Sequence, residues 1–459
     1  MALTIALTLH YPRLTILLNT ISRIMEYPRV LLMHMTRVYQ YDSANLMLRS
    51  LFGDWPKEKL AQVYTNRFTG DGDFCGHYYE LGALERRFGR VFYRLKPAGM
   101  KAMSGSKIVA GGRSLNRTLT RRLARKVSSL IVESGMWETI FPFRQSGPLA
   151  KFILGFKPSI IYSQGHSLGF TNLALEISNS FDLPICYFPL DDWHESLHSK
   201  SPVHRKVDRV ATAIARRASV RFALGPKMTE RLTTRYGVPF DCLYHADDSS
   251  RFRITNPERN FGKRPPVFGY MGSLYLGRAT SISDLLSACQ RLNQDFKIRI
   301  YSDRSPANIP DALAKSPHVE FLPLPTHEEL PNKLQECDLL FLPESFELKY
   351  RKGIELSLST KCHLYMLSGR PIIVYGPSWS GTVDYARRHG WGLIVDKRNT
   401  EDLLRGIKKI MNDSAAVNYI STARDVARNN HNLKALRSHI FESISDISEE
   451  NKHHGQRGQ

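Results

Sequence analysis

The residues best suited to carry chemistry lie in the C-terminal half of the chain, directly after short apolar runs. Glu344 and Glu347 follow the apolar run 338–342, and Lys361 stands where the next helix is expected to begin. Open parallel sheets bind ligands beyond the carboxyl ends of their strands, and a helix N-terminus there favours phosphate. We therefore expect Lys361 to contact phosphate and one of the glutamates to reach a polar ligand. The alternative for Lys361 is a solvated surface charge.

These residues need a scaffold, and the second half of the chain has the pattern of one. Short apolar runs alternate with amphipathic stretches, which is typical of strands buried on both faces of a parallel sheet. Helices are expected at 281–293, after the capping box Thr326–Glu329 and after Asn399. The pattern predicts a doubly wound α/β domain. Its predicted strands are 267–270, 297–301, 318–322, 338–342, 371–375 and 392–396.

The first half repeats this alternation less regularly. A polar stretch ending in Pro265 and Pro266 separates the two halves and is interpreted as a linker. The predicted strands of the first half are 30–35, 62–64, 90–95, 159–162, 184–188 and 220–224. The predicted division is an extension 1–26, a first Rossmann-like domain 27–250, a linker 251–266, a second Rossmann-like domain 267–430, a helix 431–448 that could cross back to the first domain, and a disordered tail 449–459.

The N-terminal residues 1–24 contain no acid and no unbroken apolar run of the roughly 20 residues that span a bilayer. They also lack the basic start and continuous apolar stretch of a secretory signal. Two interpretations remain open: a dispensable extension, or an amphipathic anchor on a membrane surface. We expect a cytoplasmic protein.

The charge of the chain points to an anionic partner. Lys and Arg number 64 against 43 Asp and Glu, a formal net charge of +21. Thirteen of these basic residues fall between Arg86 and Ser129, where no acid occurs. This block could be a solvated surface or could dock on anionic lipid head groups. Nucleic acid is disfavoured because no nucleic-acid-binding motif accompanies the charge.

Metals and disulfides are not expected. The six cysteines are scattered and form no C-x-x-C pair, which argues against structural zinc or a disulfide framework. Asp71-Gly72-Asp73 matches the D-x-D pattern of metal-dependent sugar transferases by letter only, within a Gly-rich loop. Because Arg and Lys can stabilise a leaving diphosphate electrostatically, we expect no cofactor and no required metal.

Three segments of the second half carry a resemblance to a known family. Ser368–Pro371 ends a helix in a small-Gly-x-Pro turn, Gly390–Val395 is a Gly-x-Gly-hydrophobic strand, and Phe268–Leu274 is a strand followed by a glycine turn. Together they resemble the C-terminal domain of retaining glycosyltransferases of the group-1 type (glycosyltransferase family 4). That family has the GT-B fold, which implies two Rossmann-like domains facing across a cleft.

The resemblance implies roles in binding a nucleotide-sugar donor. The family's glycine turn approaches the donor diphosphate, which implies that contact for Gly272 and Ser273, with Arg278 near the basic contact. Segment 319–324 is similar to the one that flanks the nucleotide base, which implies a base contact for Leu322.

The same resemblance implies that Glu344 or Glu347 reaches the donor sugar, and that Lys361 joins Arg278 on the phosphate. For Arg278, as for Lys361, a solvated surface charge is the alternative.

The first half resembles the family's acceptor domain more weakly, through Ile160–His166 and Leu183–Trp193. This implies a donor-sugar or acceptor contact for His166 and an acceptor-side position for Asp191. The alternatives are an ordinary loop histidine and, for Asp191 and Asp192, the capping of a helix.

One departure from the family pattern is clear. The family usually has two glutamates eight residues apart, the second of them five residues before the glycine of the Gly-x-Pro turn. Counting back from Gly369 gives Leu364, which cannot bond a ribose hydroxyl. Glu347 and Glu355 have the spacing of eight, either by coincidence or because a longer loop brings Glu355 into place.

The resemblance implies transfer of a sugar from a nucleotide-diphosphate donor to an acceptor hydroxyl, with retention. The acceptor would be a glycan or a lipid-linked glycan, as in polysaccharide biosynthesis, with the protein peripheral at the inner face of the membrane. His166, Asp191 and Glu347 are then the candidate catalytic residues. The rival hypotheses are a non-catalytic GT-B scaffold at the membrane, which Leu364 favours, and a nucleotide-sugar epimerase, which would want buried acid/base carboxylates.

Overall fold

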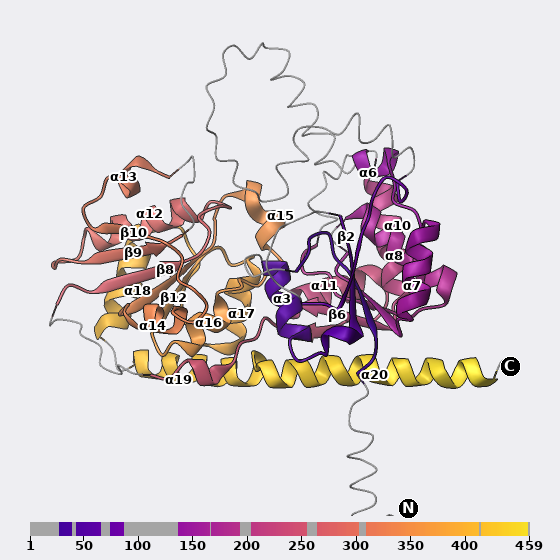
Figure 1. Cartoon of the computed structure of the whole chain (residues 1–459). Helices are drawn as coiled ribbons and strands as arrows, with labels where there is room; N and C mark the ends of the chain where they lie inside the picture. The colour runs from indigo at the N-terminus through magenta and orange to yellow at the C-terminus, as the bar shows by residue number, and fades with distance from the viewer. Residues whose placement is uncertain are drawn as a thin grey trace, which may run out of the picture.

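The protein was analysed as a computed structural model, which describes residues 27–38, 43–65, 74–86, 136–165, 167–192, 203–254, 264–302, 309–412 and 415–457. The expected extension 1–26, the predicted strand 90–95 and nearly all of the basic block 86–129 lie outside these residues. Within them the chain forms two parallel sheets with helices on their faces (Figure 1).

The first sheet has the order β3-β2-β1-β4-β5-β6-β7, and every described pair of neighbours is parallel. Every side chain of the internal strand β1 is buried, as expected of a strand covered on both faces. The strands are β1 (Val30–Met33), β2 (Leu60–Tyr64), β3 (His77–Glu80), β4 (Ile160–Ser163), β5 (Ile185–Tyr187), β6 (Val220–Leu224) and β7 (Asp241–Leu243). The helices are α3 (Ser43–Phe52), α6 (Met136–Ile140), α7 (Gly147–Phe156), α8 (Leu168–Phe181), α10 (His204–Arg217) and α11 (Pro226–Tyr236).

The second sheet has the order β10-β9-β8-β11-β12-β13 and is also parallel. Strand order reverses beside β8, and ligands of doubly wound sheets bind at such a switch point. The strands are β8 (Val267–Met271), β9 (Lys297–Tyr301), β10 (Val319–Leu322), β11 (Leu339–Pro343), β12 (Ile372–Tyr375) and β13 (Leu393–Val395). The helices are α12 (Arg278–Cys289), α13 (Asp311–Ala314), α14 (Leu330–Gln335), α15 (Arg351–Ile354), α16 (Cys362–Leu367), α17 (Gly381–His389) and α18 (Thr400–Asn412).

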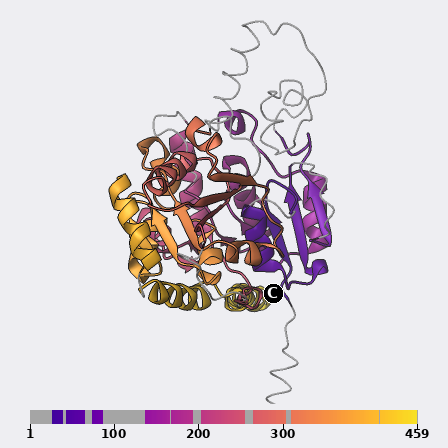
Figure 2. The ribbon, with the colours of Figure 1, turned by 90° about the vertical axis from the view of Figure 1, so that its left-hand side faces the viewer.

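Of the two final helices, α19 (Ala415–Asn430) packs on the second domain, whereas α20 (Leu433–Arg457) returns to the first. Helix α20 runs along the bottom of the molecule in Figure 1 and is seen end-on in Figure 2. Leu436, Ile440 and Ile444 from this helix belong to the apolar core of the first sheet. Arg437 pairs with Asp54 beside α3. The first domain is therefore built from both ends of the described chain.

The chain passes between the domains twice, and the two passages touch. Asp247 forms a parallel bridge with Asn432, and its backbone amide donates to the carbonyl of His431 at 3.3 Å. Asp247 lies on the way from β7 to the second sheet, whereas His431 lies between α19 and α20.

Most predicted strands agree with the observed ones to within two residues. Strands β3 and β7 were not expected, because both are short edge strands: β3 (His77–Glu80) has no aliphatic residue and β7 (Asp241–Leu243) has three residues. Helix α20 also continues to Arg457, through most of the stretch expected to be a disordered tail. In the described part of the chain, no helix is long and apolar enough to cross a membrane.

Candidate functional site

The candidate site lies at the carboxyl edge of the second sheet, where the turns after β8 and β11 meet the starts of α12, α16 and α17. Its centre is Glu344, a buried residue directly after β11. One carboxylate oxygen, Oε2, lies 3.4 Å from Arg278 Nη2, and the other, Oε1, accepts a hydrogen bond of 3.0 Å from the Thr382 hydroxyl. Both oxygens are therefore engaged by the protein.

The backbone around Glu344 is also fixed. Its amide donates to the carbonyl of Tyr375 at 2.7 Å, and its carbonyl accepts from the Ser281 hydroxyl at 2.8 Å. These bonds connect β11 to β12 and α12. A charge held so firmly gives the guanidinium of Arg278 a defined position, which is what a preorganised anion-binding site requires.

Arg278 is the first residue of α12, and Glu344 stabilises its charge. Burial opposes the charged form, but the charge and hydrogen bond of Glu344, together with Tyr270, outweigh it, so the pKa of Arg278 is raised. Its Nε is buried, and among the described residues it has no hydrogen-bond partner. The structure thus excludes the freely solvated surface charge that was the alternative for Arg278.

Lys361 precedes α16 and lies against the glycine turn after β8. A Cβ on Gly272 would lie 2.2 Å from Lys361 Cε, so the turn leaves room for the lysine only because residue 272 is glycine. Gly272 has φ +135°, a conformation that other residues rarely adopt. Lys361 Nζ lies 5.7 Å from the ring centroid of Tyr270.

Burial, followed by the repulsion of Arg278, lowers the pKa of Lys361 to about 7. The side chain keeps part of its surface accessible nonetheless. A group that is only partly accessible and is crowded by protein atoms differs from a freely solvated surface charge.

The remaining donor-side candidates are placed less centrally. Ser273 accepts a hydrogen bond from the amide of Tyr275 through its hydroxyl, at 3.2 Å. Leu322 is the last residue of β10 and is half-buried. Glu347 pairs with Lys349 at 2.5 Å, on the same loop as Glu344 but not in its network.

The departure from the family pattern is also visible. Leu364 is half-buried and packs against the apolar core of the second domain. Glu355 pairs with Arg351 at 3.0 Å and does not share the Glu344 network. Among the described residues, neither supplies a carboxylate to the cluster of Glu344, Arg278 and Lys361.

On the first domain, Asp191 follows β5 and is exposed, yet surrounding protein raises the pKa of its carboxyl group by desolvation. Asp192 is buried and lies 3.4 Å from Arg235 of α11, so its role is an ion pair rather than an acceptor contact. His166 lies outside the described residues, as does Asp71-Gly72-Asp73.

Several polar residues near the carboxyl edge of the first sheet were missed by sequence reasoning. Ser163 ends β4 and has a buried hydroxyl with no hydrogen-bond partner among the described residues. Gln62 binds the loop after β1 by donating to the carbonyl of Thr36 at 2.7 Å. Glu138 is a half-buried acid whose carboxylate accepts from the amide of Gly169 at 3.0 Å.

Thr382 is the clearest example of a residue of this site that the sequence did not indicate. It is fully buried in the first turn of α17, and its hydroxyl both donates to Glu344 and accepts from the amide of Ser359 at 3.0 Å. A threonine after a glycine at a helix start is too common to mark a site.

The two domains also touch beside this site. Lys227 of α11 donates to the carbonyl of Trp379 at 2.5 Å, just before α17. Arg388, near the end of α17, pairs with Glu230 of α11 at 2.8 Å. The helix that carries Thr382 is therefore held by the first domain at both ends.

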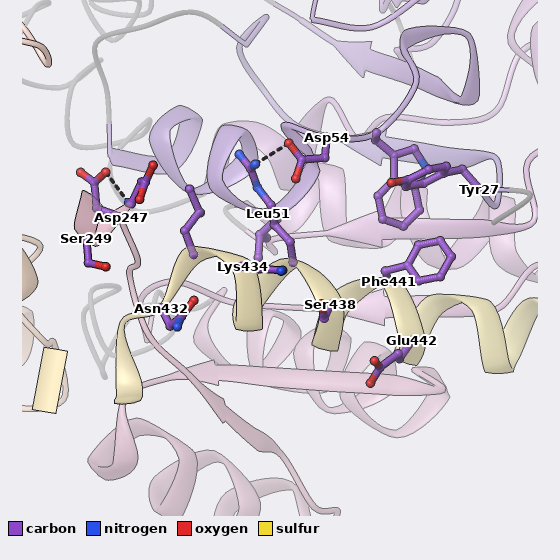
Figure 3. A pocket seen from close by; sticks show the side chains of 14 residues that line it. Tyr27, Leu51, Asp54, Asp247, Ser249, Asn432, Lys434, Ser438, Phe441 and Glu442 are labelled. Atoms are coloured by element: carbon purple, nitrogen blue, oxygen red, sulfur yellow. Dashed lines mark hydrogen bonds and ion pairs between the residues drawn. The ribbon is translucent and has the colours of Figure 1, made fainter. Parts of the chain in front are cut away.

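A separate cavity of about 620 Å³ lies along α20, at the two chain passages (Figure 3). Tyr27 and Phe441 line one part of it, and Asp247, Asn432 and Lys434 line another. None of the candidate site residues lines it. In the described part of the chain, no cluster of three or more His, Cys, Asp or Glu could hold a metal ion.

Residues 265–413 match the family described as glycosyl transferases group 1. This segment contains Gly272, Arg278, Glu344 and Lys361. The chain carries a group-1 glycosyltransferase domain. The protein is accordingly an enzyme of the glycosyltransferase class. No curated protein matches the chain by sequence.

Solved structures resemble the whole enzyme in fold. Anabaena HepE, in complex with UDP and glucose, has a TM-score of 0.54 at 14% identity, covering 91% of this chain and all of that one. Sucrose-phosphate synthase from Thermosynechococcus elongatus has a TM-score of 0.58 at 12% identity, covering 91% and 98%. WaaG, a glycosyltransferase involved in lipopolysaccharide biosynthesis, has a TM-score of 0.52 at 12% identity, covering 90% and 99%. The expected GT-B arrangement of two Rossmann-like domains is thereby confirmed.

Proposed function

We propose that the glycosyltransferase moves a sugar from a nucleoside-diphosphate donor to an acceptor hydroxyl, with retention of anomeric configuration. The observation that carries this proposal is the pair of cations at the glycine turn. Arg278 is fixed by Glu344, and Lys361 lies against Gly272, all within the group-1 domain. The structural relative HepE is in complex with UDP and glucose, the two components of such a donor.

In this proposal the diphosphate lies between Arg278, Lys361 and the backbone of Gly272 and Ser273. The two cations stabilise the negative charge that develops on the leaving diphosphate, so transfer requires no metal. Leu322 contacts the base, Glu347 the donor sugar, and His166 and Asp191 the acceptor side. The acceptor hydroxyl attacks from the face that the diphosphate leaves, and a phosphate oxygen takes its proton.

The test combines binding with chemistry. The protein is screened by thermal shift against UDP-, GDP-, ADP- and dTDP-sugars, and hydrolysis of the stabilising donor is followed by NMR. We expect one nucleotide class to raise the melting temperature, with slow release of sugar of unchanged anomeric configuration. No shift and no turnover with any donor would support the non-catalytic scaffold that Leu364 favours.

The acceptor belongs to a second proposal: a glycan or lipid-linked glycan at the anionic inner face of a membrane. Its support is the basic block 86–129, with thirteen Lys and Arg and no acid. The described residues on either side of this block pair with each other. Arg86 forms an isolated antiparallel β-bridge with Phe143, and the amide of Arg144 donates to the carbonyl of Glu85 at 2.8 Å. The block is therefore attached to the first domain, which carries Asp191.

Vesicle sedimentation tests this part. We expect binding to vesicles with 30% anionic lipid, loss of that binding at high salt, and little binding to neutral vesicles, because each basic residue near an anionic surface adds about 1 kcal/mol. Equal binding to neutral and anionic vesicles would refute the electrostatic account.

A further inference from the structure

The candidate donor site contains one cation that is paired and one that is not. Arg278 is neutralised by Glu344, whose second oxygen already accepts the Thr382 hydroxyl. Among the described residues, none forms a hydrogen bond or an ion pair with Lys361 Nζ. Its nearest charged neighbours are therefore the repelling Arg278 and an acid that is already engaged.

The protein packs closely against the aliphatic stem of Lys361 but offers no ion-pair partner to its ammonium group among the described residues. The aliphatic stem lies where a Cβ of residue 272 would be, and the buried ring of Tyr270 lies 5.7 Å from Nζ. Cys362, the other titratable neighbour, has its thiol pKa raised by burial, so it stays neutral and offers no counter-charge. An ammonium here is only partly accessible to water and has no ion-pair partner among the described residues, and both conditions favour the neutral form.

Building on the proposed function, we propose that Lys361 is largely neutral in the empty enzyme above pH 7 and takes up a proton when the donor diphosphate binds beside it. The diphosphate supplies the negative charge that the protein does not. The empty site then carries one net positive charge fewer than its two cations imply, and the second charge forms only in the complex. A lysine is suited to this because it changes charge readily when buried, whereas an arginine does not.

The coupling between proton uptake by Lys361 and diphosphate binding can be measured, and its direction is fixed. Lys361 with a pKa of about 7 would be about 90% neutral at pH 8, so binding of a fully ionised diphosphate would take up about 0.9 proton. For the same reason, affinity for the diphosphate should fall more than about tenfold between pH 7 and pH 9, because the proton becomes harder to obtain.

The experiment is isothermal titration calorimetry of the full chain with the nucleoside diphosphate that gives a thermal shift, UDP first. Titrations at pH 8 in buffers of different ionisation enthalpy give the number of protons taken up. In wild-type protein we expect about 0.9 proton per UDP. Lys361→Arg should bind UDP with almost no proton uptake and lose affinity less than about twofold between pH 7 and pH 9, since its guanidinium is always charged.

Two further variants make the result decisive. Lys361→Met should bind more weakly and also without proton uptake, which covers a failure of the longer arginine to fit against Gly272. Lys397→Met, which removes an exposed lysine of the same domain, should leave the uptake unchanged. Tight binding by wild type with less than about 0.2 proton taken up would overturn the coupling and leave the proposed function standing. Absence of binding by every nucleoside diphosphate would overturn both.

Discussion

The Arg278 guanidinium lies 3.4 Å from the Glu344 carboxylate, and this pair fixes the chemistry of the candidate site. Glu344 is buried and also accepts the Thr382 hydroxyl, so both of its oxygens are engaged by the protein; in the proposed function it acts on the donor through Arg278. The three residues come from α12, the end of β11 and α17, so the site depends on the packing of three separate segments.

Arg278→Met should weaken binding of the nucleoside diphosphate by about ten- to a hundredfold, since a hydrogen bond to a charged group contributes about 1.5–3 kcal/mol. The measurement is UDP affinity by calorimetry. The single variant leaves Glu344 unpaired, so the double variant Arg278→Met, Glu344→Gln separates lost stability from lost binding. Arg291→Met, on the exposed surface after α12, is the matched control. Wild-type affinity in the Arg278 variant would remove the phosphate assignment.

Thr382→Val should destabilise the fold by about 1–3 kcal/mol, because two buried groups, Glu344 Oε1 and the amide of Ser359, lose their partner. UDP affinity should also fall, by a smaller factor than in the Arg278 variant, as the guanidinium loses its fixed support. Thr382→Ser keeps the hydroxyl and should restore both properties. Urea unfolding and calorimetry provide the two readouts; a valine variant with unchanged stability and affinity would contradict the role of Thr382.

Lys361→Met should stabilise the empty enzyme while weakening donor binding. The pKa of Lys361 is lowered to about 7 in the folded state, so the unfolded state binds more protons between about pH 7 and pH 10.5. Wild-type stability therefore gains from rising pH across that window, and the advantage of the methionine variant is largest at its lower end. At pH 7 we expect at least about 1 kcal/mol, a rise in melting temperature of about 2 °C or more. A lower melting temperature than wild type would contradict this.

Three neutral histidines should make the protein sensitive to acid. His245, His363 and His431 form a stack with ring centroids 5.7 and 6.2 Å apart, where the chain passes between the domains. Burial lowers the pKa of His245 to about 4 and that of His431 to about 3, and it lowers that of His363 well below its usual range. The unfolded state then binds more protons below about pH 6.5, so stability falls as pH drops from there toward pH 4.

The groups around this stack explain which variant to test. His431 is satisfied, since its Nε2 lies 3.0 Å from the Tyr385 hydroxyl and its Nδ1 lies 2.6 Å from the carbonyl of His245. His363 Nδ1 has no partner among the described residues, and His327 adds repulsion. The free energy of unfolding of His363→Phe should therefore fall less than that of wild type between pH 6.5 and pH 4.5, by up to about 1.4 kcal/mol per pH unit, and its melting temperature should fall less accordingly. The exposed His439→Phe is the control; identical slopes in all three proteins would contradict the assignment.

Ile440→Ala should destabilise the first domain although residue 440 follows the second domain in sequence. Ile440 is fully buried in the core of the first sheet, so the cavity should cost about 2–5 kcal/mol in unfolding free energy. Urea unfolding followed through Trp55 fluorescence reports on this core, and the exposed Ser438→Ala serves as control. An unchanged transition would mean that α20 is not part of the first domain's core.

The sequence predicted the second domain well because its strands are buried on both faces. Such strands consist of unbroken apolar runs, and each predicted run there corresponds to an observed strand from β8 to β13. The sequence did not predict the edge strand β3 (His77–Glu80), for the opposite reason. It is half exposed, and its histidine, tyrosines and glutamate do not form an apolar run.

The candidate site was predictable only in part. Gly272 and Arg278 could be selected through the family resemblance, and Lys361 through its position at a helix start. The partners of Glu344 could not be predicted from the sequence. Only the folded chain shows that its two carboxylate oxygens contact Arg278 and Thr382, which are 66 and 38 residues away. Partnership over such distances depends on strand order, which no local pattern encodes.

The hydrogen bond between Asp247 and His431 has a mechanical consequence. The two covalent connections between the domains lie side by side, so neither domain can slide along the other without pulling these segments apart. Rotation about this point remains, and it requires the contacts of Lys227 with Trp379 and of Glu230 with Arg388 to open. Such a rotation displaces each atom in proportion to its distance from the axis, so groups far from these two segments move most.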